Sequence, residues 1–512
     1  MAHRIDKVLI VGGGTAGWMT ASMLCRRRPQ LSVTVVESPS VPKVGVGEAT
    51  IIQMTEFLRD MGLGERDWMR GCNATYKEGI HFQHFLRQDI DYWHPFQNIQ
   101  RELTDFWLHR YYREGLGPQQ YFEHCFSNTV LNAANRVNVE NKVNFDRVRQ
   151  VSYSYHLDAT RFGEFLKERI ALPAGVAHVV DEVTEVVVGE DGFVDCVRSA
   201  GHGELRADLY VDCTGFRSLL LGQALGGEFI DYTDKLPNDR AIAVRMPYRD
   251  KEAELHPYTS ATALEAGWVW NIPLWSRVGT GYVYSSAHKN RDQAEAELRR
   301  HLGEARVKDL DFHHIDMRIG RRRHPWHNNV VAVGLASGFI EPLESTGIEL
   351  IQVGADFLCY YLESRDDNSA VTRVLYNKKM QIVYDEIADY IQLHFILSER
   401  EDTAYWRALK YDLHPLRDEL LATLLRYESS FAQPPEGHVF LDTAWCALLM
   451  GFRQFPTRAN LRPLDPESVP AANRFMDENL RHARESIASD SGYPSHHQFL
   501  RKHIYADEEV AP

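Results

Sequence analysis

The sequence lacks any apolar stretch near the ~18–20 residues that a membrane-spanning helix requires. Its N-terminal apolar residues run directly into a glycine turn, without the cleavage site that a signal peptide carries. The seven cysteines are scattered, odd in number and form no Cys-x-x-Cys pair. This excludes a disulfide framework and is typical of a reduced intracellular protein. These absences predict a cytoplasmic protein that does not associate with membranes.

Positive charge is also scarce. Lysine and arginine together number 57 against 71 acidic residues, so the formal net charge is −14, and the one dense basic run, at residues 321–324, is short. This balance excludes broad nucleic-acid binding, because phosphate contacts need clustered cations. The adjacent histidine pairs at 313–314 and 496–497 lack the i, i+4 spacing of a helical metal site, and there is no P-loop or G-x-S-x-G elbow. We therefore expect neither a nucleic-acid partner nor a metal.

A dinucleotide-binding pattern occupies the first forty residues. An apolar strand at 8–11 leads into the turn GGGTAG at 12–17, a helix follows to about residue 28, and a second strand from residue 32 ends at Glu37. The glycines have separate tasks, which are tight turning, backbone approach to a pyrophosphate, and close packing of helix on strand. The helix N-terminus faces the phosphate charge, and Glu37 can accept hydrogen bonds from ribose hydroxyls. The unphosphorylated ribose that this implies favours FAD or NAD over NADP.

The remaining pattern predicts an α/β protein in two parts. Residues 38–50 are expected to form a loop, and short strands are expected within 176–212, 240–285 and 330–333. Helices are expected within 89–144 and at about 348–364, 374–400, 416–428, 442–451 and 470–488. We assign residues 1–88 and 150–365 to an FAD-binding, Rossmann-like body of the flavin monooxygenase type. Residues 89–149 and 366–505 are assigned to a mostly helical substrate-binding part, and 506–512 to an acidic tail.

The segment EPLESTGIE at 341–349 predicts a helix start. Thr346 and Glu349 have the spacing of a capping box ahead of an apolar-periodic run. The first backbone N–H groups of that helix, at Thr346, Gly347 and Ile348, also form a candidate anion pocket at a positive helix end. Glu344 lies just outside this end and could face a cavity on the other side.

Two further features admit a structural and a functional interpretation. Lys77 follows Tyr76 in an apolar setting, and its residues alone favour a surface lysine whose stem packs on the protein. Trp268 and Trp270 share one face if GWVWNIPL is a strand, and Pro273 would end its pairing. Two indoles on one face are either core aromatics or a flat wall for a ligand.

Together these residues resemble the flavin-dependent tryptophan halogenase family. The resemblance spans nearly the whole chain and is carried by GGGTAG at 12–17, VGVGEAT at 44–50, VDCTGF at 211–216, W-x-W-x-I-P at 268–273 and GFIEPLESTGI at 338–348. It implies that reduced FAD and oxygen convert halide into hypohalous acid, which a tunnel carries to Lys77. It also reverses the first interpretation of Lys77, which becomes buried and catalytic together with Glu344. Trp268 and Trp270 would keep the substrate away from the flavin.

The resemblance assigns the remaining site residues. Halide would bind at Thr346 and Gly347, and Lys77 would hold hypohalous acid by a hydrogen bond or form a haloamine. Glu344 would stabilise positive charge on the ring and help remove its proton. The expected cofactor-binding residues are Gly12, Gly14, Thr15, Ala16, Gly17, Glu37, Gly47, Glu48, Ala49, Asp212, Gly215, Gly338 and Ile348. The expected substrate-binding residues are His94, Phe96, Trp268, Trp270 and Trp445.

One departure bears on the substrate. In the branch that acts on free tryptophan, the resemblance leads us to expect a Tyr-Tyr pair ahead of a helix, but the matching stretch here is TAWCAL at 443–448. We therefore predict indole or another electron-rich aromatic, either free or carrier-bound. Because one dinucleotide fingerprint serves one cofactor, a separate NAD(P)H-dependent flavin reductase is expected to supply reduced FAD. A homodimer, chloride or bromide preference, and the position of halogenation stay open.

Two other functions compete with this interpretation. A flavin monooxygenase of the same fold would hydroxylate an aromatic, although it would need direct contact between substrate and flavin. A flavin-binding protein without turnover would need neither Lys77 nor Glu344.

Overall fold

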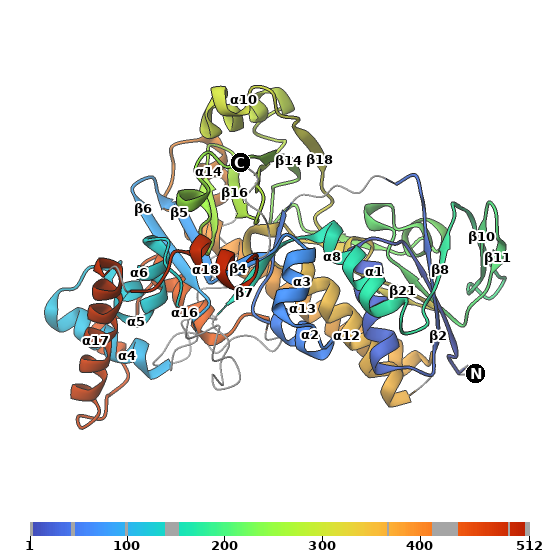
Figure 1. The fold of residues 1–512 in the computed structure, drawn as a ribbon, viewed down its shortest axis with the longest axis horizontal. Coiled ribbons are helices and arrows are strands. Elements are labelled where there is room, and N and C mark those ends of the chain that lie inside the picture. Colours follow the sequence, from blue (N-terminus) through green and yellow to red (C-terminus); the bar gives the residue numbers. More distant parts are fainter. Residues whose placement is uncertain are drawn as a thin grey trace. The chain divides into compact units, whose positions relative to one another are not determined.

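A computed structural model describes residues 4–41, 47–97, 101–138, 153–365, 368–411, 439–489 and 492–506 (Figure 1). The chain forms two compact units. The first comprises residues 1–74, 157–239 and 316–388, and the second comprises 75–156, 240–315 and 389–512. Against the predicted boundaries, the main difference is that residues 240–315 cluster with the second unit, because their strands pair with the strands around residues 80–95. The predicted helix at 416–428 and residues 507–512 of the predicted tail lie outside the described residues.

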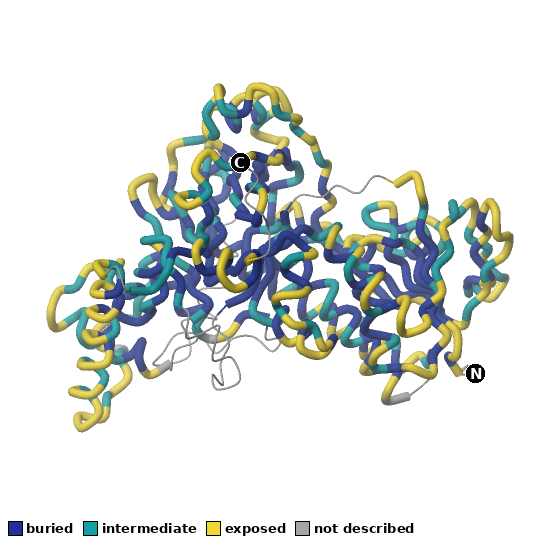
Figure 2. Tube along the Cα trace, viewed as in Figure 1, coloured by how far each residue is buried: buried dark blue, intermediate teal, exposed yellow. Residues whose placement is uncertain are grey.

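The first unit contains a six-stranded sheet in the order β20-β21-β12-β1-β2-β8. Strands β1 (Lys7–Val11), β2 (Ser32–Glu37), β8 (Ala177–Val180), β12 (Leu209–Asp212) and β21 (Val330–Ala332) run parallel, and β20 (Trp326–His327) runs antiparallel at the edge. The inner strands are apolar runs because both faces of a parallel sheet are covered, and they fall among the buried segments in Figure 2. The β-turn-α-β unit predicted for the first forty residues is confirmed.

Helices and smaller sheets complete the first unit. Helix α1 (Thr15–Arg27) packs against α8 (Ala159–Leu166) and α12 (Gly347–Arg365). The other elements are β3 (Gly47–Ala49), α2 (Met54–Asp60), α3 (Glu65–Gly71), β9 (Val183–Val188), β10 (Val194–Ser199), β11 (Gly203–Leu205), β13 (Phe229–Asp231), β19 (Gly320–Arg322) and β22 (Gly338–Phe339). The strands predicted within 176–212 are therefore confirmed, and the predicted loop at 38–50 contains the short strand β3.

The second unit contains a seven-stranded sheet in the order β18-β14-β17-β16-β15-β5-β6. Its strands are β5 (Gly79–Arg87), β6 (Ile90–Pro95), β14 (Arg240–Met246), β15 (Thr259–Ala263), β16 (Gly267–Pro273), β17 (Val278–Tyr284) and β18 (His313–Asp316). Strand β16 is internal, with β15 and β17 antiparallel to it on either side. A short strand, β4 (Thr75–Lys77), pairs separately with β7 (Ser154–Asp158).

Helices gather in the C-terminal part of the chain, as predicted. Helix α13 (Ala370–Ile396) runs from residues of the first unit into residues of the second. The further C-terminal helices are α14 (Ala404–Tyr411), α16 (Asp442–Gly451), α17 (Val469–Ala488) and α18 (His496–His503). Earlier in the chain the second unit has α4 (Arg101–Glu114), α5 (Gln120–Cys125), α6 (Ser127–Ala133), α9 (Lys251–Glu254), α10 (Arg291–Leu302) and α11 (Glu304–Val307). In the part of the chain that the structure describes, no helix is long and apolar enough to cross a bilayer.

The glycine turn joins β1 to α1 through close backbone packing. Gly12 adopts φ +116°, a conformation that side chains disfavour. A Cβ at Gly17 would lie 1.9 Å from the carbonyl oxygen of Gly12, whereas a Cβ at Gly14 would meet no heavy atom within 4 Å. The predicted tasks of turning and packing are therefore confirmed for Gly12 and Gly17.

Replacing Gly17 with alanine is expected to destabilise the protein by ~1–3 kcal/mol or more. The new methyl group would clash with the Gly12 carbonyl, and neither group can shift without moving the backbone. Urea or thermal unfolding measures the loss. Gly14→Ala is the matched control, since its methyl group enters open space. Equal losses in the two variants would contradict the packing role of Gly17.

Candidate functional site

The turn at the start of α1 fits an anionic cofactor. This helix has no side-chain cap and no acidic residue in its first turn. Its first N–H groups have no intrahelical acceptor, and the helix dipole makes this end positive. The open space beside Gly14 leaves room for a group to approach the backbone. The residues therefore fit the pyrophosphate of a dinucleotide such as FAD.

Glu37 ends β2 next to this turn. Its side chain lies against Gly13, where an added Cβ would be 2.4 Å from the glutamate Cγ and Cδ. One carboxylate oxygen, Oε2, lies 3.0 Å from His178 Nε2 and 3.6 Å from Lys167 Nζ. The carboxylate is thus fixed at the end of the strand where the sequence predicts the ribose contact.

Asp212 ends β12 and organises the turn that follows. Its two carboxylate oxygens accept hydrogen bonds from the backbone N–H groups of Thr214, Leu220 and Leu221. These bonds hold a turn in which Gly215 adopts φ +66° with open space where a Cβ would be. A contact of Asp212 with a cofactor would therefore run through the turn it shapes, because the side chain itself is fully buried.

The start of α12 departs from a standard helix cap. The helix begins at Gly347 as predicted, and Ser345 before it adopts the strained left-handed conformation with φ +62°. The predicted capping box is wrong, because Thr346 Oγ1 is buried and has no hydrogen-bond partner in the part of the chain that the structure describes. Glu349 instead lies at a buried position near Glu56 of α2, on the side of α12 that packs against α2. The first turn of α12 therefore lacks the cap that Thr346 was predicted to supply.

Acidic side chains surround this helix start within the first unit. Glu344 is fully buried, and Glu341 beside it accepts a hydrogen bond of 2.8 Å from Asn238 Nδ2. A Cβ added to Gly347 would lie 4.0 Å from Glu48 Oε2, so the structure brings together two residues predicted on separate segments. Burial raises the pKa of the Glu48 carboxyl to about 7. At lower pH a neutral Glu48 would repel an anion near Gly347 less strongly.

In the second unit, Lys77 is fully buried on β4. Its Nζ lies 4.7 Å from the centroid of the Phe96 ring, a distance at which an ammonium group and the ring face attract each other. The surface position that the residues alone favour for Lys77 is therefore wrong, and the buried position that the resemblance implies is confirmed. The cause is tertiary, since β4 pairs with β7 and both strands are buried along their length.

Trp268 and Trp270 lie on one face of β16, as their spacing predicts. Their ring centroids are 6.3 Å apart at an interplanar angle of 60°, and both rings are buried. The indole of Trp270 covers Gly281 on β17, where a Cβ would lie 2.3 Å from the ring. Among the described residues Trp268 Nε1 has no hydrogen-bond partner, so Trp268 packs through its ring surface.

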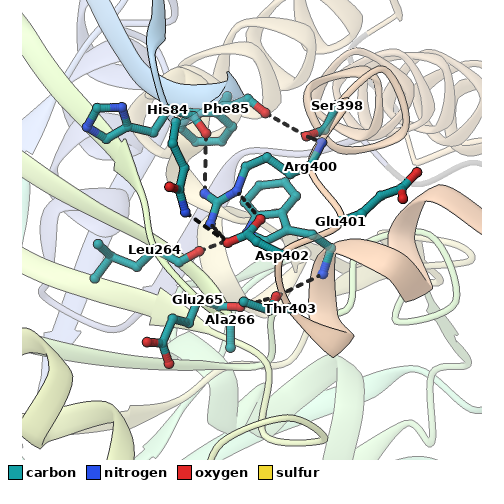
Figure 3. Close-up of polar contacts among 12 residues, drawn as sticks. His84, Phe85, Leu264, Glu265, Ala266, Ser398, Arg400, Glu401, Asp402 and Thr403 are labelled. Atoms are coloured by element: carbon teal, nitrogen blue, oxygen red, sulfur yellow. Dashed lines mark hydrogen bonds and ion pairs between the residues drawn. The ribbon is translucent and has the colours of Figure 1, made fainter.

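The turn from β15 into β16 is held from the C-terminal part of the second unit. Figure 3 shows Thr403 Oγ1 donating to the carbonyl of Glu265 at 2.7 Å. Trp406 Nε1 donates to the carbonyl of Leu264 at 2.8 Å, and its ring is covered by the Arg400 guanidinium. Arg400 in turn pairs with Asp402 at 2.8 Å. The strand that carries both tryptophans therefore begins at a rigid point.

An aromatic cluster surrounds His94 on β6. Its imidazole centroid lies 5.5 Å from the Phe96 ring, 6.2 Å from Tyr390 and 6.4 Å from Phe440. Trp445 on α16 joins through Tyr390, at 4.7 Å and an interplanar angle of 87°. Tyr390 and Phe440 were not predicted from the sequence, because a tyrosine on a long helix and a phenylalanine after a proline-rich segment carry no local signal. The structure thus brings His94, Phe96 and Trp445 together.

The predicted site residues divide between the two units. The first unit contains the cofactor-binding and halide-binding residues together with Glu344, and the second contains Lys77, the tryptophan pair and the aromatic cluster around His94. Each group of residues is thus assembled within its own unit.

The fold and the dinucleotide turn define a mixed α/β protein with a Rossmann-like fold of the type that binds FAD, and comparisons with known proteins give the family. A family model described as tryptophan halogenase matches residues 7–464. A 7-chloro-L-tryptophan 6-halogenase, KtzR of Kutzneria sp. (strain 744), is 37% identical over 97% of this chain and 99% of its own. The chain therefore belongs to the flavin-dependent tryptophan halogenase family, whose members are oxidoreductase-type enzymes.

Solved structures agree over nearly the full length. The crystal structure of SttH, a tryptophan 6-halogenase from Streptomyces toxytricini, superposes with a TM-score of 0.85 at 38% identity, covering 97% of this chain and 99% of that one. BrvH, a flavin-dependent halogenase from Brevundimonas sp. BAL3, gives a TM-score of 0.84 at 33% identity, covering 98% and 99%.

The buried Glu349 predicts a pH-dependent stability. Burial raises its pKa from 4.5 to about 8, and the charges of Glu56 and Asp356 add to the effect. Because the folded pKa lies above the unfolded one, the native state holds this proton, and stability falls as pH rises from about 4.5 to about 8. Glu349→Gln removes the titration, so its stability relative to wild type should rise by ~1–3 kcal/mol across this window. Urea unfolding at both ends measures the change, and a difference that does not vary with pH would contradict it.

Proposed function

We propose that this protein is a halogenase that uses reduced FAD, oxygen and halide to halogenate an electron-rich aromatic ring through Lys77. One observation carries the proposal, which is that Lys77 is fully buried beside Phe96 in the unit that also contains the paired tryptophans. A lysine is costly to bury without a chemical task. Membership in the tryptophan halogenase family supports the same conclusion.

Bound reduced FAD would supply two electrons and two protons, which with oxygen, halide and one further proton yield hypohalous acid, water and oxidised FAD. Gly12, Gly14 and Gly17 with Glu37 would hold this cofactor, and the uncapped first turn at Thr346 and Gly347 would hold the halide. A separate NAD(P)H-dependent reductase would deliver the reduced cofactor, since the sequence carries one dinucleotide fingerprint.

Lys77 would act on the hypohalous acid. As an ammonium group it can hydrogen-bond the oxygen, which makes the halogen more electrophilic, and give it the proton with which the oxygen leaves as water. The halogen then bonds to a ring carbon, and that carbon loses its proton. The resemblance implies that a carboxylate, Glu344, accepts this proton, and Glu344 is buried. The ring carbon closest to Lys77 would be the one halogenated.

The aromatic cluster around His94 would hold the substrate ring. His94, Phe96, Tyr390 and Phe440 present flat faces and few polar groups, which suits an indole. We propose indole or a simple indole derivative, because residues 443–448 lack the expected Tyr-Tyr pair. Free tryptophan is the second candidate, since KtzR and SttH are named for tryptophan substrates.

Product mass separates the candidate reactions. The protein is supplied with reduced FAD, oxygen and bromide, together with indole or tryptophan in separate reactions. We expect bromine addition, faster with indole than with tryptophan. A strong preference for tryptophan would overturn the indole assignment. Oxygen addition would indicate a monooxygenase, and an unchanged substrate with stable flavin binding would indicate a protein without turnover.

Replacing Lys77 with methionine is expected to lower the rate of ring bromination at least ~100-fold, because it removes the donor that activates the hypohalous acid. Methionine keeps an unbranched side chain of similar length and avoids a cavity. Consumption of reduced FAD and bromide should continue, and a diffusible scavenger should capture the hypobromous acid. Bromination that persists in Lys77→Met would rule out the proposed role of Lys77.

A further inference from the structure

Strand β4 is only three residues long, so its own ladder with β7 cannot fix the Lys77 backbone strongly. Hydrogen bonds between β4 and other elements of the second unit supply additional anchors. Thr75 Oγ1 donates to the carbonyl of Pro273, the last residue of β16, at 2.6 Å. Tyr76 N donates to His496 Nε2 at 3.2 Å. The strand with Lys77 is thus tied directly to the end of the strand with both tryptophans.

His156 of β7 supports Thr75 from the other side. Its Nδ1 lies 3.2 Å from Thr75 Oγ1, and its Nε2 lies 2.9 Å from Thr259 Oγ1 on β15. The hydroxyl of Thr75 has one hydrogen, and it donates that hydrogen to Pro273. His156 Nδ1 must therefore be the donor to Thr75. In a neutral imidazole protonated on Nδ1, Nε2 then accepts from the Thr259 hydroxyl, and this form completes the network.

The surroundings of His156 keep it neutral. The side chain is fully buried, and burial, followed by the positive charge of Lys77, lowers its pKa well below the ordinary value. A proton on Nε2 would place a second cation close to Lys77. His496 is itself held with Nδ1 donating to the carbonyl of Leu255 and Nε2 accepting from Tyr76. Both histidines therefore act here as fixed neutral hydrogen-bonding groups.

We propose that Thr75 and His156 are positioning residues for the halogen-transfer step, which fix Lys77 relative to Trp268 and Trp270. The chain of bonds from Thr259 through His156 and Thr75 to Pro273 holds β4 against β16 within one unit. This inference rests on the proposed function. A lysine that handles a small diffusible oxidant must meet it at one place, since a displaced amine lets the oxidant escape.

The proposal is tested by how the oxidant divides between indole and a scavenger. Wild type and variants receive reduced FAD, oxygen and bromide together with indole and a diffusible scavenger of hypobromous acid, and the ratio of bromoindole to brominated scavenger is measured. Thr75→Val keeps the side-chain shape but removes the hydroxyl, and it should lower this ratio at least ~10-fold. Thr75→Ser restores the hydroxyl and should recover the wild-type ratio within about twofold.

A second variant shows whether Thr75 and His156 share one role. His156→Phe keeps a ring of similar size and removes both nitrogens, so the ratio should fall as in Thr75→Val. The double variant should fall no further than either single change, because both break the same chain of bonds. Additive losses would overturn the assignment of one shared role.

Thr262 provides the matched control. It lies on β15 like Thr259, is buried, and its hydroxyl donates to Gln83 Oε1 at 2.8 Å, away from His156. Thr262→Val should leave the ratio unchanged although it also loses a buried hydroxyl bond. An equal fall in Thr262→Val and Thr75→Val would show a general packing defect and would overturn the proposal.

Crystal structures of the variants give a readout that does not require turnover. In Thr75→Val the distance from Lys77 Nζ to the Phe96 ring, 4.7 Å in the wild type, should change by at least ~0.5 Å, and in Thr75→Ser it should not. An unmoved Lys77 in Thr75→Val would overturn the positioning role even if the wild type brominates indole. A wild type that brominates neither indole nor scavenger would instead show that the proposed function has failed.

Discussion

The burial of the Lys77 side chain is the constraint on which the second unit depends. An ammonium group taken out of water loses its hydration, and the protein must replace it with specific contacts. The Phe96 ring supplies one such contact, and two anchored strands hold the lysine backbone. The neighbouring histidines satisfy their hydrogen bonds without adding positive charge. Burial of the Lys77 side chain lowers stability, and it is useful where a reaction needs an amine that is shielded from water.

The first unit presents two candidate anion sites that are built from backbone N–H groups. Its parallel sheet delivers the start of α1 to a turn of glycines, and the start of α12 presents a first turn without a side-chain cap. Backbone N–H groups at a helix start can bind an anion without a buried cation. The Glu48 carboxylate near Gly347 would oppose an anion there by repulsion, and burial raises the pKa of that carboxyl to about 7. A chain of net negative charge can offer such sites because the backbone supplies the partial positive charge.

The two units thus divide chemistry of opposite electrical character. Anion-binding backbone and acidic side chains belong to one, and the buried cation with its aromatic surroundings belongs to the other. For a reaction that proceeds through a diffusible oxidant, this division means that each group of residues is held by contacts within its own unit. The strand with the tryptophans is held at its start by Thr403 and Trp406 and at its end by Thr75.

The sequence by itself determined the features that depend on local pattern. The strand, glycine turn and second strand of the first forty residues follow from hydrophobic period and glycine spacing, and so do the shared face of Trp268 and Trp270 and the start of α12. Tertiary structure decided what local pattern could not, namely the burial of Lys77, the absence of a capping bond at Thr346 and the meeting of Tyr390 with His94. It also decided that residues 240–315 cluster with the unit of Lys77. The physical reason is that burial and pairing partners come from segments far apart in the chain, and a side chain's neighbours in sequence do not specify them.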